Sequence, residues 1–576
     1  MPIHNSDVSE VFSKVADLLE IQGANAFRVR AYRNAARIVG ALGQSVSDML
    51  AQGEDLSDLP GLGKDLAGKV EEVVNTGKLS QLEELEKKVP PELTQILKIS
   101  TLGPKKVSAL YRELGITNIE DLKKAANENK VRTLDGFGEK TEQKILEEVK
   151  RFEGEQGKRR IKLIEAEERA EPLADYLKKE KGVKDIVVAG SYRRRKETVG
   201  DLDILVTCKK GSDLMERLVK YDDVTQVVSK GKTRSTVILR SGLQVDVRVV
   251  PQVSYGAALH YFTGSKAHNI AVRKLGVARG LKINEYGVFD KKDNRLAGQT
   301  EEEVYDQVDL PYIEPELREG SGETEAAKKR TLPKLIKRED IVGDLHTHTK
   351  ETDGHHDLKE LAEAAQDRNY KYLAITDHSK RVSMAHGLNA KRLAQQIKAI
   401  DRINGKLKGL RLLKGIEVDI LEDGSLDLSD EILKELDLRV CSVHYHTNLS
   451  AKKQTERIIR AMDNPYFNIF AHPTGRLINE REPYELDMEK VIRAAGERGC
   501  FLEINAHPDR LDLSGKYCKR AKEMGVKMAI STDAHRITNL DYMRFGVDQA
   551  RRGWLEPDDV INAKGVKALV KLFKRK

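Results

Sequence analysis

The sequence predicts a multidomain protein in which an all-α region is followed by an α+β unit and then by a β/α barrel. The chain has 576 residues, and chains of that length usually divide into several domains because a single hydrophobic core stops growing at smaller sizes. Residues 1–153 contain short helical stretches punctuated by glycine, whereas strand-like runs such as DIVVAG and DLDILVT begin only near residue 160. Beyond residue 340, apolar runs such as YLAIT, FNIFAH and CFLEIN alternate with amphipathic helical stretches, which is the pattern of a barrel.

The overall composition allows a polyanionic partner but does not require one. The chain carries 100 Lys and Arg residues against 92 Asp and Glu residues, a net charge of +8. The four cysteines form no Cys-x-x-Cys pair, which suits a reducing compartment. The first ten residues are polar, and no apolar run approaches the roughly 18 residues that a membrane span needs. We therefore expect a cytoplasmic protein with no membrane association.

A glycine turn opens an amphipathic helix at three places in the all-α region, at residues 59–74, 100–114 and 134–149. Glycine lets the backbone approach a ligand closely, and the N–H groups at the start of a helix hold an anion well. One copy could be an ordinary turn, but three copies resemble the helix-hairpin-helix motif, which grips the DNA backbone without reading bases. The residues expected to contact the DNA backbone are Gly61, Gly63, Gly103, Gly136 and Gly138.

Three carboxylates on two predicted strands form the first candidate catalytic set. Because side chains alternate along a strand, Asp201 and Asp203 in DLDILVT project from one face. Asp246, in LQVDVRVV, shares a face with Gln244 and Arg248, away from the core side. If these strands are neighbours, three carboxylates meet, and carboxylates are the ligands that Mg²⁺ prefers in two-ion phosphoryl transfer.

A loop suited to a triphosphate precedes this set. Gly190 and Ser191 lie in the loop, and Arg194 follows as a charged clamp. The alternative interpretation, surface carboxylates on an edge strand, does not account for the glycine loop, the arginine and the third strand together.

These motifs resemble those of the family X DNA polymerases, which include DNA polymerase beta. The resemblance covers residues 1–315 and rests on Gly-Ser-x-x-Arg at residue 190, Gly-Asp-Leu-Asp at residue 200, Asp246 and Tyr-Phe-Thr-Gly at residue 261. It implies that Asp201, Asp203 and Asp246 bind Mg²⁺ and that Asp246 accepts the proton of the primer 3′-hydroxyl. It also implies a template contact by Arg273 and nucleotide contacts by Gly190, Ser191, Arg194, Gly200, Tyr261, Phe262, Gly264 and Asn269.

The same resemblance implies the domain boundaries. Residues 1–85 are expected to form a helical, 8-kDa-like DNA-binding domain with one helix-hairpin-helix, and residues 86–153 a helical DNA-binding subdomain with two more. Residues 154–250 are expected to form the palm nucleotidyltransferase subdomain and residues 251–315 the nucleotide- and template-binding subdomain. Residues 316–340, rich in charge, Pro and Gly, have little to bury and are predicted to be a linker before the barrel at residues 341–576.

Lys69 is a candidate lyase residue. It stands where the animal repair enzyme has its Schiff-base lysine for removing 5′-deoxyribose phosphate, but Asn34 and Asp65 replace two lysines of that enzyme. A lysine nucleophile needs a lowered pKa, and losing cationic neighbours makes that harder. The alternative is that Lys69 contacts a phosphate.

Histidines and carboxylates recur at predicted strand ends in the C-terminal half. His346 and His348, two residues apart, leave a strand toward the same side, a common geometry for sharing a metal. A lone histidine after an apolar run is more often structural, but catalytic groups of barrels gather at the C-terminal ends of strands, where all the candidates occur. The candidates are His346, His348, Asp353, His378, Glu417, His444, His472, Asp533 and His535.

Their order and spacing resemble the polymerase and histidinol phosphatase (PHP) domain, a distorted β/α barrel that binds up to three metals. The resemblance implies one metal on His346, His348, Glu417 and Asp533, a second on Glu417, His444 and His472, and a third on Asp353, His378 and His535. Mixed imidazole and carboxylate ligands suit Mn²⁺ or Zn²⁺. Nearby, Arg476 either anchors a phosphate or forms a structural salt bridge. Five further histidines either contact the substrate or lie on the surface: His355, His356, His386, His446 and His507.

A family X polymerase followed by a PHP barrel is the arrangement of many bacterial and archaeal members, and it implies a monomeric repair enzyme. We expect it to fill short gaps in gapped or primed DNA with dNTPs in base excision repair and to trim 3′ ends as a 3′-5′ exonuclease. The barrel is also a candidate AP endonuclease. Two alternatives remain open: a polymerase fused to a small-molecule phosphatase, and a DNA-end scaffold with inactive sites. Tethering to DNA-gripping motifs argues against the first, and the complete ligand sets argue against the second.

Overall fold

The computed structural model describes residues 5–40, 42, 46–59, 61–90, 92–97, 99, 102–155, 160–209 and 212–574. The chain divides into two compact units. The first comprises residues 1–160, 219–227 and 237–244, and the second comprises residues 161–218, 228–236 and 245–576.

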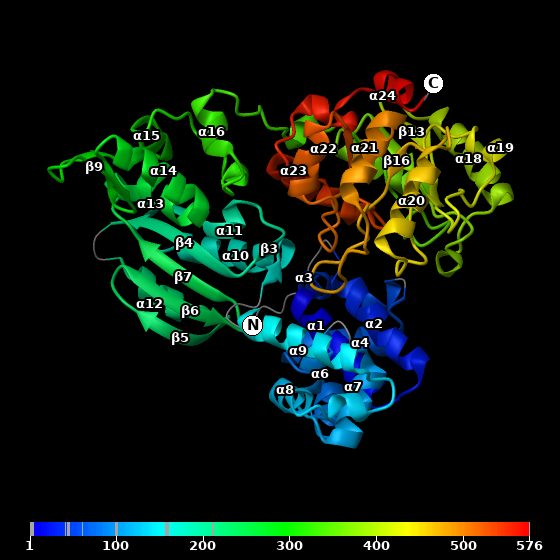
Figure 1. Cartoon of the computed structure of the whole chain (residues 1–576), viewed down its shortest axis with the longest axis horizontal. Helices are drawn as coiled ribbons and strands as arrows, with labels where there is room; N and C mark the ends of the chain where they lie inside the picture. The colour runs from blue at the N-terminus through cyan, green and yellow to red at the C-terminus, as the bar shows by residue number, and fades with distance from the viewer. Residues whose placement is uncertain are drawn as a thin grey trace. The chain divides into compact units, whose positions relative to one another are not determined.

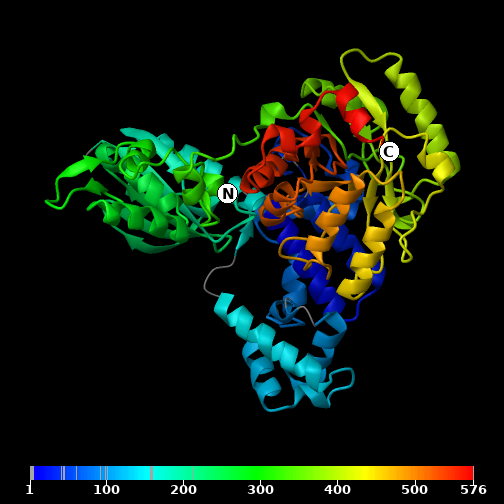
Figure 2. The same ribbon diagram turned by 45° about the horizontal axis from the view of Figure 1, so that its top comes forward.

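Every regular element among the described residues 5–155 is helical, which confirms the predicted all-α region (Figure 2, blue to cyan). Apolar side chains from Val8 to Val149 form one core, in which the rings of Phe12 and Tyr32 lie 5.7 Å apart. The helices are α1 (Asn5–Ile21), α2 (Ala26–Gly40), α3 (Val46–Ala51), α4 (Lys64–Thr76), α5 (Ser80–Glu86), α6 (Leu93–Ile96), α7 (Pro104–Leu114), α8 (Ile119–Asn127) and α9 (Glu139–Glu155).

The three predicted glycine turns lead into helices. Helices α4, α7 and α9 begin directly after Gly63, Gly103 and Gly138. Gly61 and Gly136 lie three residues before the first residues of α4 and α9. They adopt positive φ values of 86° and 78°, which a residue with a Cβ atom tolerates poorly. Gly63 and Gly103 cap their helices without a side-chain hydrogen bond, so the helix N–H groups there are not screened by a capping side chain.

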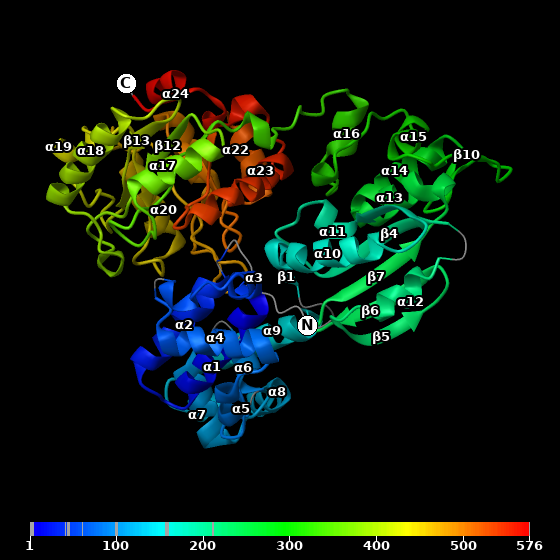
Figure 3. The ribbon, with the colours of Figure 1, turned by 180° about the vertical axis from the view of Figure 1, so that it is seen from behind.

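The predicted α+β unit contains a five-stranded sheet with strand order β2-β4-β7-β6-β5, in which β2 pairs antiparallel with β4. Figure 3 shows β4, β7, β6 and β5 side by side. Strand β4 buries Leu202 and Ile204 completely, while Asp201 and Asp203 are half-buried, as the predicted alternation requires. The elements of this region are β1 (Ile161–Lys162), α10 (Leu163–Lys178), β2 (Val183–Val188), α11 (Gly190–Arg193), β3 (Thr198–Val199), β4 (Asp201–Cys208), α12 (Leu214–Val219), β5 (Val224–Lys230), β6 (Arg234–Leu239) and β7 (Gln244–Val249).

The segment that follows packs on a separate apolar core around Val272, Val288 and Tyr305. Its elements are α13 (Tyr255–Thr263), α14 (Lys266–Ala278), β8 (Lys282–Asn284), β9 (Gly287–Phe289), β10 (Arg295–Ala297), α15 (Glu301–Asp306) and α16 (Glu323–Lys328).

The expectation that residues 316–340 bury little is wrong. Arg318 is fully buried and Glu323 is 1% exposed. They can be buried because each has a partner of opposite charge or a hydrogen-bond partner: Arg318 Nη1 lies 2.5 Å from Glu301, and Glu323 lies 2.8 Å from His268 Nδ1. Composition alone does not reveal such pairing.

The C-terminal region is the predicted β/α barrel, built from two parallel sheets of order β11-β12-β13 and β14-β15-β16-β17-β18. Isolated bridges from Thr347 to Ala534 and from His378 to Glu417 link the two sheets. Helices α20 to α23 stand outside the strands (Figure 1). The elements are β11 (Gly343–Asp344), α17 (Leu358–Asp367), β12 (Tyr372–Ile375), α18 (Ala390–Asn404), β13 (Arg411–Lys414), β14 (Glu417–Asp419), α19 (Asp430–Leu433), β15 (Val440–Ser442), α20 (Ala451–Met462), β16 (Ile469–Phe470), α21 (Met488–Arg498), β17 (Phe501–Asn505), α22 (Gly515–Glu523), β18 (Met528–Ser531), α23 (Met543–Arg552) and α24 (Val566–Leu572).

Within the described residues, no helix is both long enough and apolar enough to cross a bilayer.

Candidate functional sites

The nine candidate ligands of the barrel converge at the strand ends. His346 and His348 follow β11, and Asp533 follows β18. The bridge from Thr347 to Ala534 brings these two segments side by side. His346 Nε2 lies 3.5 Å from Glu417 Oε2 and 3.5 Å from Asp533 Oδ1. His348 Nε2 lies 3.1 Å from Asp533 Oδ1. These four residues therefore lie around one small volume.

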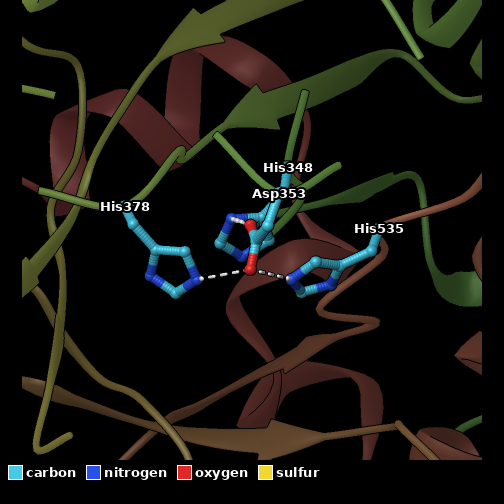
Figure 4. Close-up of side chains that lie close together, drawn as sticks. All are labelled: His348, Asp353, His378 and His535. Atoms are coloured by element: carbon cyan, nitrogen blue, oxygen red, sulfur yellow. Dashed lines mark ion pairs between the residues drawn. The ribbon is translucent and has the colours of Figure 1, made fainter. Parts of the chain in front are cut away.

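A second group surrounds Asp353, whose carboxylate points between imidazole rings (Figure 4). Asp353 Oδ2 lies 3.4 Å from His378 Nε2 and 3.4 Å from His535 Nε2. The other oxygen lies 3.8 Å from His348 Nδ1. His348 thus faces two groups, one through each ring nitrogen.

Glu417 is the centre of the third group. Its Oε1 lies 3.3 Å from His444 Nε2 and 3.1 Å from His472 Nε2, and its Oε2 lies 2.7 Å from His378 Nδ1. The sets of potential ligand atoms that lie within 4.8 Å of one another are His346-His348-Asp533, His348-Asp353-His378-His535 and His378-Glu417-His444. They overlap more than the three predicted sets, because His348 and His378 each belong to two.

The electrostatics of the cluster fit a bound cation. Four buried ligand atoms make no hydrogen bond among the described residues: His346 Nε2, His348 Nδ1, His378 Nδ1 and Glu417 Oε2. Burial opposes the ionisation of Glu417, yet the neighbouring imidazoles, His378 foremost, hold its pKa well below its usual range. Burial, followed by the charges of His535 and His378, lowers the pKa of His348 to about 3, so this imidazole is neutral. Burial opposes the protonation of His346 and His378, but neighbouring carboxylates raise the pKa of both well above its ordinary value, so these two imidazoles must release a proton when they bind a metal.

Two buried carboxylates behind the ligands were missed by the sequence reasoning. Glu503 Oε1, on β17, lies 2.7 Å from His346 Nδ1, and Asp419 Oδ1, on β14, lies 3.4 Å from His444 Nδ1. Carboxylates in such positions fix the orientation and tautomer of a metal-binding imidazole. A signal was present for Glu503, which is an acidic residue within the apolar run at residues 501–504.

Three of the other residues noted near the barrel site have side-chain partners: Arg476, His446 and His507. Arg476 forms a two-point ion pair with Glu197, with Nη2 2.9 Å and Nη1 3.1 Å from the carboxylate oxygens. This geometry favours the structural salt bridge over the phosphate anchor. His446 pairs with Glu422, and His507 packs edge-on against the ring of Tyr542.

In the palm, the strands that carry the three aspartates are neighbours, as the sequence reasoning required. Asp246 is 6% exposed, and its Oδ1 accepts hydrogen bonds from Thr236 Oγ1 at 2.6 Å and Arg234 Nη2 at 3.2 Å. Among the described residues, the palm aspartates do not form a set of three ligand atoms within 4.8 Å. The hydrogen bonds to Thr236 and Arg234 hold the Asp246 oxygen toward β6, which is a physical reason for this separation.

The predicted triphosphate loop packs against the carboxylates. Gly190 has a φ of 63°, and a Cβ atom at this position would lie 2.9 Å from Asp203 Oδ2. Arg194 donates through Nη1 to the carbonyl of Thr263 and through Nε to Glu319 Oε1 at 2.9 Å. The structure therefore brings Gly190, Asp203 and Arg194 together with the turn after α13.

Four other predicted contacts, Tyr261, Phe262, Asn269 and Arg273, lie on α13 and α14. Tyr261 and Phe262 stack edge to face with ring centres 5.1 Å apart, and the guanidinium of Arg248 lies 4.3 Å from the ring centre of Phe262. Asn269 donates to the carbonyl of Tyr261 at 2.7 Å, while Arg273 is exposed on α14.

Lys69 makes an ion pair that opposes a nucleophilic role. Its Nζ lies 2.5 Å from Asp65 Oδ2 and 5.6 Å from the ring centre of Tyr32. Burial lowers the pKa of Lys69, but the hydrogen bond to Asp65 and the nearby Tyr32 raise it more, so the net pKa lies above its ordinary value. A raised pKa keeps the amine protonated, which favours the phosphate-contact interpretation.

Comparisons with known families cover most of the chain. Residues 3–79 match a helix-hairpin-helix domain and residues 92–151 a SAM-like helix-hairpin-helix tandem. Residues 160–258 match the DNA polymerase beta palm, residues 258–319 the DNA polymerase beta thumb and residues 344–507 the PHP domain.

Curated relatives match the whole chain or one of its parts. The "DNA polymerase/3'-5' exonuclease PolX" of Bacillus subtilis (strain 168) is 39% identical over 578 residues, 100% of both chains. A "Probable phosphatase" of Thermoanaerobacter sp. (strain X514) is 35% identical over 221 residues, 36% of this chain and 82% of the relative. "DNA polymerase lambda" of Arabidopsis thaliana is 27% identical over 351 residues, 55% of this chain and 62% of the relative.

Proposed function

Since the chain belongs to the family X DNA polymerases that carry a C-terminal PHP domain, we propose that it extends primer ends in gapped DNA with dNTPs and removes nucleotides from 3′ ends. The palm performs the extension and the barrel the hydrolysis. The observation that carries this proposal is the cluster of imidazoles and carboxylates at the barrel's strand ends, in the same chain as aspartates on adjacent palm strands. The proposed role is filling short gaps in base excision repair.

In the palm, Asp201, Asp203 and Asp246 are proposed to hold Mg²⁺, and Asp246 to take the proton of the primer 3′-hydroxyl. For this step Asp246 Oδ1 would exchange the hydrogen bond from Thr236 and the ion pair with Arg234 for contact with a metal ion. The other proposed contacts are with the nucleotide (Gly190, Ser191, Arg194, Gly200, Tyr261, Phe262, Gly264 and Asn269), the template (Arg273) and the DNA backbone (Gly61, Gly63, Gly103, Gly136 and Gly138).

In the barrel, Mn²⁺ or Zn²⁺ is proposed to bind the three predicted ligand sets, which the mixed imidazole and carboxylate donors suit. Ions held there supply Lewis acidity and neutralise charge on the scissile phosphate. Glu503 and Asp419 orient the imidazoles of His346 and His444. Cleavage at abasic sites is a further activity proposed for the same site.

Paired variants test the division of labour. Asp201→Ala with Asp203→Ala is expected to abolish nucleotide addition and to spare 3′ digestion, whereas His346→Ala with His348→Ala is expected to do the reverse. Both activities are measured on one labelled, gapped duplex, with circular dichroism as the check on folding. Loss of both activities in either folded variant would refute the proposal.

A second candidate function, hydrolysis of small phosphate monoesters, is supported by the similarity of the barrel to a protein named as a phosphatase. Comparing the rates on labelled DNA and on a small phosphate monoester decides between them. Faster turnover of the monoester, with DNA left intact, would favour this second function.

A further inference from the structure

The loop that carries the triphosphate contacts is held by the barrel as well as by the palm. We call residues 190–197 the nucleotide loop. Arg195 Nε lies 2.7 Å from Asp548 Oδ2 on α23, and Glu197 accepts the two-point ion pair from Arg476 after β16. The barrel therefore contacts this loop on both sides of the Lys196 backbone.

A third contact reaches Arg194 itself. Arg552, the last residue of α23, donates through Nη1 to the carbonyl oxygen of Arg194 at 2.9 Å and lies 3.2 Å from Glu319 Oε1. The same Glu319 oxygen accepts from Arg194 Nε at 2.9 Å. One carboxylate oxygen thus joins an arginine of the palm to an arginine of the barrel.

Burial and charge make this junction firm. The side chains of Arg194, Arg552 and Glu319 are 12%, 13% and 23% exposed. Burial raises the pKa of Glu319, but Arg194, Arg552 and Lys196 lower it more, so the carboxyl stays ionised. Without the charge of Glu319, the guanidinium groups of Arg194 and Arg552 would face each other in a largely buried environment, and their repulsion would displace Arg194.

Helix α23 has little freedom to adjust. Gly546 lies so close to the barrel strands that a Cβ atom there would be 2.4 Å from Ile530 Cγ2 and 2.8 Å from Ala506 Cβ. Phe545 and Val547 on the same helix are buried. The position of Arg552 is therefore set by the packing of the barrel core.

We propose that Arg552 and Glu319 are positioning residues for nucleotide addition, through which the barrel seats the triphosphate clamp Arg194. This inference rests on the proposed function. The contacts to Glu319 and Thr263 use Nε and Nη1 of Arg194, and among the described residues Nη2 makes no hydrogen bond, so it can meet a phosphate oxygen of the incoming nucleotide. Arg552 touches no reacting atom and acts only through Arg194.

The test compares Arg552→Gln, Glu319→Gln and the double variant of the full chain on gapped DNA. Each single variant is expected to raise the KM for dNTP about ten- to hundredfold, the range for losing one charge-assisted hydrogen bond, with kcat changed less than about twofold. The double variant should be no worse than the worse single variant, because both changes break one junction. Digestion of single-stranded DNA by the barrel should remain unchanged.

Arg520→Gln is the matched control, because Arg520 lies on α22 of the same barrel and pairs only at the surface, with Glu489 and Glu523. An unchanged KM in both single variants, additive losses in the double variant, or an equal fall in digestion would each overturn the inference. Failure of the unmodified protein to add nucleotides would instead refute the proposed function, and this inference with it.

Discussion

Glu503→Gln probes the support behind the barrel's ligands. Glu503 is fully buried on β17, and both of its oxygens act as acceptors. Oε1 lies 2.7 Å from His346 Nδ1, while Oε2 accepts from the backbone N–H of His472 at 2.7 Å and from Asn505 Nδ2 at 3.2 Å. Glutamine has only one acceptor oxygen. Its amide NH₂ would therefore face either His346 Nδ1 or the N–H donors of His472 and Asn505.

The magnitude follows from this geometry. A buried donor left unsatisfied costs about 1–3 kcal/mol. Because the carboxylate holds His346 with Nε2 toward Glu417 and Asp533, part of this cost falls on metal binding. Loss of such a supporting group usually lowers metal affinity about ten- to hundredfold, or about 1.4–2.8 kcal/mol.

The assay is a titration of chelator-treated protein with Mn²⁺, followed by calorimetry and by digestion of 3′-labelled DNA. Glu503→Gln should need about ten- to hundredfold more Mn²⁺ for half-maximal digestion, while nucleotide addition stays normal. Glu497→Gln serves as the control, because Glu497 is an exposed residue of α21. Half-saturation at the same Mn²⁺ concentration in both variants would refute the role given to Glu503.

Three further predictions concern the polymerase half. Glu301→Gln should destabilise the protein at pH 7 by about 3–5 kcal/mol, because it leaves the buried Arg318 without its counter-charge. Burial raises the pKa of Glu301, but Arg318 and Arg193 lower it more, from 4.5 to about 2. The stabilisation from Glu301 is therefore present above pH 4.5 and is lost as the pH falls toward 2. Melting curves of the variant should lack this pH dependence. Gly190→Ala, which places a Cβ atom 2.9 Å from Asp203 Oδ2 at a positive φ, should lower kcat/KM for dNTP by about tenfold or more and spare digestion, and a normal kcat/KM would contradict the close packing. Because Lys69 is paired with Asp65, borohydride should trap no covalent adduct between Lys69 and abasic DNA. An adduct that forms in the unmodified protein and is lost in Lys69→Ala would restore the lyase hypothesis.

The polymerase site shows how far local sequence patterns reach. Alternation along a strand predicted that Asp201 and Asp203 share one face. The sequence did not predict that β4 and β7 are neighbours, which the structure shows. The glycine turn at Gly190 was predicted because its motif is local. Its packing against Asp203 was visible only in three dimensions.

The sequence by itself determined the order of the domain types, the helix starts after the glycine turns and the nine candidate ligands of the barrel, because these depend on periodicity and spacing within short segments. Only the tertiary structure decided which charged groups meet. It paired Glu503 with His346, buried Arg318 in a segment that looked like a linker, and joined Arg552 to Glu319 over 233 positions of sequence. Such contacts arise from the packing of distant elements, and a single sequence carries no local signal for which distant charge will neutralise a buried one.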